Sequence, residues 1–119
     1  MNGNDIELEP SEIHALALKA SEDAAAVRNS LLPPEQERGL DCGFAWVVIK
    51  PARGKFVSYL KKQGIGSTRS YGGGGYEIWY SSLHKQATQS VSVHYAAATA
   101  YSEVLNKHGI NSYPGSRLD

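Results

Sequence analysis

The chain has 119 residues, of which 41% are hydrophobic and 20% charged, and this composition predicts one globular core. No apolar run reaches the about 20 residues of a membrane helix, and the acidic N-terminus lacks the basic and apolar regions of a secretory signal. We therefore expect a cytoplasmic protein without a membrane partner, and the single cysteine, Cys42, excludes an internal disulfide.

The formal net charge is zero, but the charges are divided between the two parts of the chain. Residues 1–42 carry nine acids and three bases, a net of −6, whereas residues 43–119 carry nine bases and three acids, a net of +6. This asymmetry predicts an acidic arm over residues 1–38 and a basic core domain over residues 39–119 that attracts anions.

A helix is predicted over residues 11–30, starting at Pro10 or Ser11. Its apolar residues recur at spacings of three, four and seven and predict a buried stripe. The stripe consists of Ile13, Leu16, Ala17, Ala20, Ala24 and Val27. Because these side chains are mostly small, we expect the helix to depend on docking against the core. Pro33 and Pro34 end it, and residues 33–39 are interpreted as a linker.

The run GFAWVVIK, residues 43–50, is apolar at alternate and intervening positions, which predicts a central strand. A helix over residues 52–63 follows, with Pro51 suited to its first turn and Gly64 to its C-terminal cap.

Two short strands, residues 65–71 and 76–81, flank a run of four glycines and predict a hairpin. The glycine run is interpreted either as a loose turn or as a place where a ligand approaches the backbone. After a polar loop we expect a helix over residues 92–108 and a last, weak strand over residues 110–118. Because Pro114 has no backbone N–H to donate, this strand should lie at the edge of the sheet.

An internal repeat supports this order of elements. Leu60, Gly64 and Ile65 recur 45 residues later as Leu105, Gly109 and Ile110. Two helix-Gly-Ile-strand units, with a strand before the first and a hairpin between them, predict an α+β fold. The expected arrangement is a ferredoxin-like βαββαβ sheet with both helices on one face, preceded by the N-terminal helix.

Four segments, GFAWV, PARGKF, YGGGGYEIW and the closing GSRLD, resemble small proteins from tailed-bacteriophage genomes. The resemblance covers residues 43–119 and leaves out the N-terminal arm. That group has no assigned chemistry, so the resemblance implies an origin, and with it the host cytoplasm, but no residue roles.

The segment KPARGK places Lys50, Arg53 and Lys55 around the predicted start of a helix. A helix N-terminus already carries positive partial charge and unpaired N–H groups, so a bound anion would stabilise this arrangement. The alternative is a solvated run of cations that point into water.

Alternation along the strands predicts that one face of the sheet meets the helices and that the other is free. Tyr76, Ile78 and Tyr80 share one face, whereas Glu77 and Trp79 lie on the other. A free aromatic face could stack nucleobases. Since no RNA-recognition signature is present, self-association through that face stays an open alternative.

We expect no catalytic residues, no metal and no cofactor, because the four histidines are scattered and the basic part contains only three acids. His84 is the best candidate for a ligand-contacting histidine, with an exposed loop histidine as the alternative.

The sequence thus predicts a small non-catalytic binding protein for a phosphate-bearing anion, a nucleotide or a nucleic acid. The alternative is a protein–protein interaction module, such as a phage inhibitor of a host protein or a virion component, and a homo-oligomer is possible in either case. The candidate ligand-binding residues are Lys50, Arg53, Lys55, Arg69, Tyr76, Trp79, Tyr80, His84 and Arg117.

Overall fold

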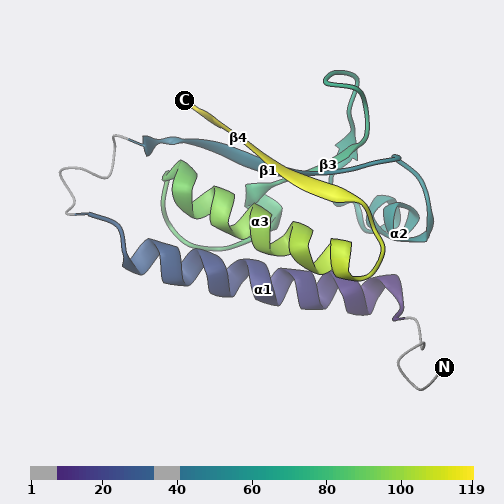
Figure 1. Cartoon of the computed structure of the whole chain (residues 1–119), viewed down its shortest axis with the longest axis horizontal. Helices are drawn as coiled ribbons and strands as arrows, with labels where there is room; N and C mark the ends of the chain where they lie inside the picture. Colours follow the sequence, from purple (N-terminus) through teal and green to yellow (C-terminus); the bar gives the residue numbers. More distant parts are fainter. Residues whose placement is uncertain (1–7, 34–40) are drawn as a thin grey trace.

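The computed structural model describes residues 8–33 and 41–119 and shows a mixed α+β fold (Figure 1). The predicted linker and the first residues of the arm lie mostly outside these ranges. No helix in the described part of the chain combines the length and apolar character that crossing a bilayer requires.

A four-stranded antiparallel sheet forms one layer of the molecule (Figure 1). Its order is β2-β3-β1-β4. The strands are β1 (Gly43–Ile49), β2 (Ser67–Thr68), β3 (Tyr76–Trp79) and β4 (Ser112–Leu118). The predicted central strand is confirmed, since β1 pairs with β3 on one side and with all of β4 on the other.

The hairpin strands are shorter than predicted. Only Ser67–Thr68 pairs with β3, and both residues are exposed. Gly66 has a φ of 79°, a left-handed conformation that interrupts the extended chain before β2. β3 ends at Trp79, where a short 3₁₀ helix, η3 (Tyr80–Ser82), takes over.

The helices α1 (Pro10–Ser30), α2 (Lys55–Gln63) and α3 (Val91–Lys107) lie on one side of the sheet (Figure 1). α3 packs against the sheet, and α1 runs antiparallel beneath α3 as an outer layer. The predicted start of α2 at its proline is wrong. Gly54, with a φ of 111°, is the N-cap, so residues 51–54 are non-helical and α2 begins at Lys55.

The buried stripe of α1 differs from the prediction. Ala17, Ser21 and Ala25 are fully buried, whereas the predicted Leu16 and Val27 are 49% and 62% exposed. The reason is a polar contact that the apolar pattern does not reveal, because Ser21 Oγ donates a hydrogen bond of 2.6 Å to Ala97 O of α3. Small side chains on both helices allow this close approach.

The two repeated helix ends have the same geometry. Ile65 N donates to Leu60 O and Ile110 N donates to Leu105 O, both at 2.9 Å, with a left-handed glycine before each isoleucine. These are the hydrogen bonds of a glycine-terminated helix, and the isoleucines pack against the edge of the core.

Candidate functional site

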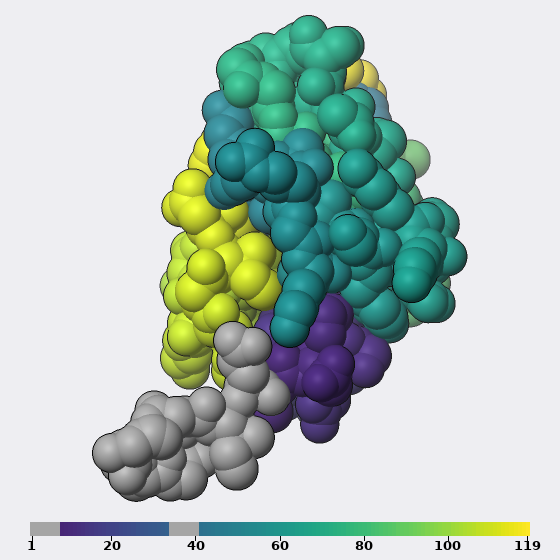
Figure 2. Space-filling view, turned by 90° about the vertical axis from the view of Figure 1, so that its right-hand side faces the viewer, coloured from purple at the N-terminus to yellow at the C-terminus, as the bar shows by residue number. Residues whose placement is uncertain are grey.

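A cavity of about 560 Å³ opens at the end of the molecule where β1 ends and α2 begins. Three segments that are distant in sequence line it. They are the start of α1 with the two residues before it (residues 8–10 and Ile13), residues 49–57 except Ala52, and residues 107–111. Figure 2 faces this end, and the purple, blue-green and yellow atoms of the three segments meet there. We call it the end cavity.

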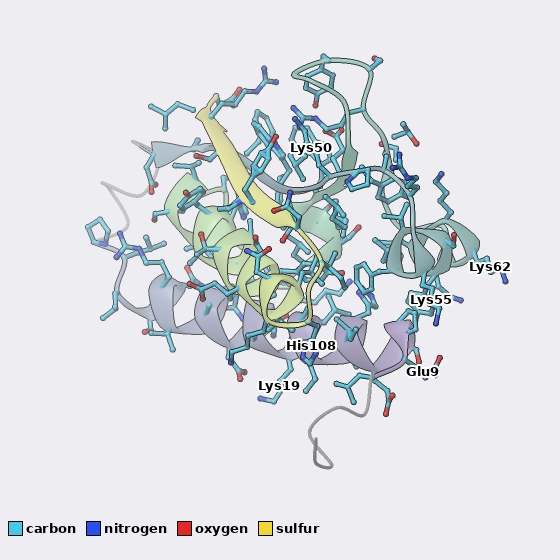
Figure 3. All side chains as sticks on the ribbon, turned by 45° about the vertical axis from the view of Figure 1, so that its right-hand side comes forward. Glu9, Lys19, Lys50, Lys55, Lys62 and His108 are labelled. Carbon is cyan, nitrogen blue, oxygen red and sulfur yellow. The ribbon has the colours of Figure 1, made fainter. Side chains whose placement is uncertain are left out.

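The end cavity combines an apolar floor with a cationic rim. Ile13, Ile49, Phe56 and Val57 are buried beneath it. The rim carries the exposed residues Arg53, Lys55, Lys107 and His108, with Glu9 as the one carboxylate among the described lining residues. Figure 3 shows Lys55, His108 and Glu9 arranged around this end, each from a different helix or helix end.

The first turn of α2 borders the end cavity through Lys55, Phe56 and Val57. That turn contains no acidic residue, and the N-cap glycine supplies no side chain to accept its N–H groups. Backbone donors and the positive end of the helix dipole therefore add to the cationic rim.

Lys50 takes a different direction from the other two cations of KPARGK. Its Nζ donates to Gly72 O at 3.3 Å and lies 5.7 Å from the centre of the Tyr113 ring. Only Arg53 and Lys55 of the predicted triplet thus present free cations at the end cavity, because Lys50 reaches the opposite side of the sheet.

The sheet side opposite the helices forms a second candidate surface, which we call the outer face. Along β1 the helix-facing residues Gly43, Ala45, Val47 and Ile49 are buried, and the intervening residues face the other way. The pairing of β1 with β3 and β4 then identifies the residues of those strands that share this face. The outer face consists of Phe44, Trp46, Val48, Glu77, Trp79, Tyr113, Gly115 and Arg117.

Trp46 and Trp79 form the centre of the outer face. They are cross-strand neighbours, their ring centroids are 5.0 Å apart, and both side chains are half-buried. The Trp46 indole lies against Gly115 of β4, where an added Cβ would come within 2.5 Å of Nε1. Glycine at this position lets the ring lie close to the strand.

Glu77 is buried within the outer face and is fully engaged by its neighbours. Its carboxylate accepts hydrogen bonds from Tyr71 OH at 2.7 Å and from Trp79 Nε1 at 2.8 Å. Arg69 Nε lies 3.4 Å from the same carboxylate, and the side chains of this ion pair are 8% and 10% exposed. The bond to Glu77 raises the pKa of Tyr71 above its ordinary value, because ionised Tyr71 would lose it.

The ion pair changes the interpretation of Arg69. Its guanidinium lies over the Tyr71 ring at 4.6 Å and donates to Tyr113 OH at 3.4 Å. Its position supports the glycine loop, residues 72–75, which rises above the outer face with φ between 57° and 100° (Figure 1). Arg69 therefore stabilises the outer face through these contacts and is not a free cation.

Two predicted ligand residues lie elsewhere. Tyr76 is 2% exposed on the helix side of the sheet, and its OH donates to Ile65 O at 2.5 Å. This burial argues against the predicted ligand-binding role of Tyr76, because the side chain belongs to the core. Tyr80 leaves the strand in η3 and stacks on His94 with a centroid distance of 3.7 Å.

His84 is buried, which rules out the alternative of an exposed loop histidine and leaves the ligand-contacting role a prediction. Its Nε2 lies 2.9 Å from His94 Nδ1, and its Nδ1 accepts from Gln86 N at 3.0 Å. A smaller hollow beside it, lined by α1 and by residues 82–85, has a volume of about 340 Å³. His84 is thus a core residue at the border of this hollow.

Arg117, by contrast, is a surface cation, and its predicted ligand-binding role stays a prediction. It is exposed at the edge strand, and its guanidinium lies 5.4 Å above the Phe44 ring. The prediction missed its aromatic partner and the glycine beside it. Pairing β1 with β4 in the antiparallel register that joins Phe44 to Arg117 and Trp46 to Gly115 would have revealed both.

Lys107 and His108 were also missed as members of a site. Their signal is topological, since an antiparallel β4 must begin beside the end of β1 and so brings the end of α3 to the start of α2.

Comparisons with known proteins add no assignment. No family model, curated protein or solved structure matches the chain. The resemblance to phage proteins therefore stays a prediction. Among residues 8–33 and 41–119, no three histidine, cysteine, aspartate or glutamate side chains gather as a group that could hold a metal ion.

Proposed function

We propose that this chain is a small non-catalytic binding protein that recognises a phosphate-bearing anion in the end cavity. The observation that carries the proposal is the convergence of Arg53, Lys55 and Lys107, from two separate parts of the chain, on one hollow. Like charges brought together on a surface repel one another, and a bound anion removes that cost.

Phosphate suits this rim better than a carboxylate does. Arginine offers a planar fork of donors, lysine offers a point charge, and the first turn of α2 adds backbone N–H groups. Several donors converging from different directions match the tetrahedral oxygens of a phosphate group. The apolar floor, with Ile49 and Phe56, leaves room for an uncharged part of the same ligand.

We also propose that the chain after α1 adopts a ferredoxin-like arrangement. The element order β1-α2-β2-β3-α3-β4 and the sheet order β2-β3-β1-β4 support it. In that arrangement each helix connects two parallel strands that have a third strand between them. The start of α2 and the end of α3 therefore lie at the same end of the strands. The fold therefore explains why the end cavity has two cationic borders.

Isothermal titration with inorganic pyrophosphate tests this function. The wild-type chain should bind, and the double variant Arg53→Gln/Lys55→Gln should lose about tenfold or more in affinity, since charged hydrogen bonds contribute about 1.5–3 kcal/mol each. The matched control is Lys61→Gln/Lys62→Gln, which removes two charges from the last turn of the same helix. Figure 3 shows Lys62 at that end. Equal loss in both variants would mean that only net charge matters, and the end cavity would not be the site.

A further inference from the structure

We propose that the outer face stacks the bases of a single-stranded nucleic acid. This inference rests on the proposed function, because it makes the phosphate-bearing partner of the end cavity a polynucleotide instead of a free nucleotide.

The stacking surface is built from three aromatic rings. Trp46 and Trp79 are inclined by 37° at 5.0 Å, and Phe44 meets Trp79 edge-on at 6.1 Å. None of the three is covered by a helix, since the described helices all lie on the other side of the sheet (Figure 1). A row of partly exposed rings offers sequence-tolerant stacking, because every base has a π-face.

The charges around these rings favour a polyanion. Arg117 lies over Phe44 at one end of the rings, and Lys50 lies over Tyr113 at the other. The carboxylate in the middle, Glu77, is paired with Arg69 and accepts hydrogen bonds from Tyr71 and Trp79. Asp119, which follows β4, is the other described acid near this surface, and it lies beyond the ring row.

The outer face is continuous with the end cavity. Ile49 pairs with Ser112, so Asn111, which lines the cavity, and Tyr113, which belongs to the outer face, stand on either side of this pair. Lys50 follows Ile49 and reaches from the cavity border to the Tyr113 ring. A strand whose bases stack on the tryptophans can therefore pass Lys50 and place a phosphate among Arg53, Lys55 and Lys107.

A second copy of the chain fits the outer face less well. A two-fold contact would bring Arg117 and Lys50 of both copies into one interface. Glu77, the acid within the face, is 7% exposed and already paired with Arg69, so it offers little charge to pair with them. Single-stranded nucleic acid supplies the missing negative charge and the flat apolar groups together.

Intrinsic fluorescence provides a direct test, because Trp46 and Trp79 are the only tryptophans of the chain. The probes are a single-stranded oligothymidylate of about twelve nucleotides, an abasic strand of the same length and inorganic pyrophosphate. We expect the intact strand to quench the emission and to bind about tenfold or more tightly than the abasic strand, which has the phosphates but no bases. Affinity for the intact strand should fall steeply as salt rises.

Substitutions separate the two surfaces. Trp79→Phe and Arg117→Gln should each weaken binding of the intact strand while leaving the affinity for pyrophosphate unchanged. Tyr95→Phe, at an exposed tyrosine of α3, and Lys62→Gln are the matched controls. Because Trp79→Phe keeps an aromatic ring and Arg117 is exposed, both variants should stay folded, which circular dichroism checks.

Each outcome is decisive. Equal affinity for intact and abasic strands would overturn base stacking and leave the proposed function standing. Binding of the intact strand without pyrophosphate binding would overturn the end cavity and keep the outer face. A wild-type dimer that Trp79→Phe or Arg117→Gln dissociates, with no quenching by the intact strand, would show that a second copy occupies the outer face.

Discussion

His84 Nε2 lies 2.9 Å from His94 Nδ1 in the interior, and this contact determines where both rings carry their protons. Because Gln86 N donates to His84 Nδ1, the His84 proton must be on Nε2 and must be donated to His94. His94 then carries its proton on Nε2, a buried atom with no hydrogen-bond partner in the described part of the chain. Both rings are therefore neutral, and His84 donates through Nε2 to the Nδ1 of His94.

We predict that acid destabilises the protein through this pair. Burial lowers the pKa of His94 from 6.5 to about 4, and burial also lowers the pKa of His84. Nearby Asp41 and Glu22 favour the charged rings but do not reverse these shifts. Between pH 6.5 and pH 4 the unfolded chain binds more protons, so the free energy of unfolding falls as the pH falls, by up to roughly 3 kcal/mol for His94.

Urea unfolding across this pH range measures the effect. The variant His94→Gln cannot titrate, so its free energy of unfolding should change less between the two limits. His14, whose pKa burial also lowers, should leave a residual slope in that variant. Parallel curves for the two proteins would show that His94 does not contribute.

The order of the elements was predictable from local patterns. Alternation and β-branching indicated β1, the paired Gly-Ile signals indicated the ends of α2 and α3, and the glycine run indicated the turn before β3. These features depend on each segment's own backbone preferences. The pair Arg53 and Lys55 was predictable for the same reason, since both flank the start of one helix.

The contacts between distant segments were not predictable in this way. The burial of His84 depends on His94, ten residues later, and the burial of Ser21 depends on Ala97 O. The hydrophobic pattern treats such polar side chains as exposed. Lys50 shows the same limit, because the carbonyl of Gly72, on another loop, determines its direction.

The contact between α1 and α3 predicts a contrast between two alanines of the same helix. Ala17 is fully buried, whereas Ala15 is exposed. Ala17→Leu must insert a larger side chain where the helices meet closely, so we expect a loss of about 1–3 kcal/mol of stability. Ala15→Leu should change stability by less than about 0.5 kcal/mol. Thermal unfolding of both variants tests the contact, and equal effects would contradict it.

Gly115 predicts a spectroscopic effect. In Gly115→Ala the new Cβ would meet Trp46 Nε1 at 2.5 Å and Cε2 at 2.7 Å, so the indole must move away from β4. We expect a shifted emission maximum and a loss of about 1–3 kcal/mol of stability. The neighbouring Ser116→Ala is the control, since Ser116 is exposed and faces the other way along the strand. Unchanged emission in Gly115→Ala would mean that Trp46 does not lie against this glycine.

The acidic start of α1 predicts that the arm weakens anion binding at the end cavity. Glu9 borders the cavity together with Arg53 and Lys55, and no ion pair shorter than 4.0 Å joins it to either within the described chain. Deleting residues 1–38 would also remove Ile13 and Ala17 from the core and would destabilise the remainder. A single substitution therefore tests the electrostatic effect without removing the helix.

In Glu9→Gln the rim loses a negative charge that opposes a bound anion. Exposed charge pairs contribute about 0.2–1 kcal/mol, so the affinity for pyrophosphate should rise about two- to fivefold at low salt. The gain should shrink as salt shortens the screening length towards about 3 Å at 1 M. Arg53→Gln in the same background should reduce the gain, because the anion is then held less closely to the rim that Glu9 borders. Glu103→Gln removes an exposed acid of α3 outside the end cavity and controls for net charge. If Glu103→Gln raises the affinity as much as Glu9→Gln does, the acidic arm acts through the overall field of the protein and does not shield the cavity.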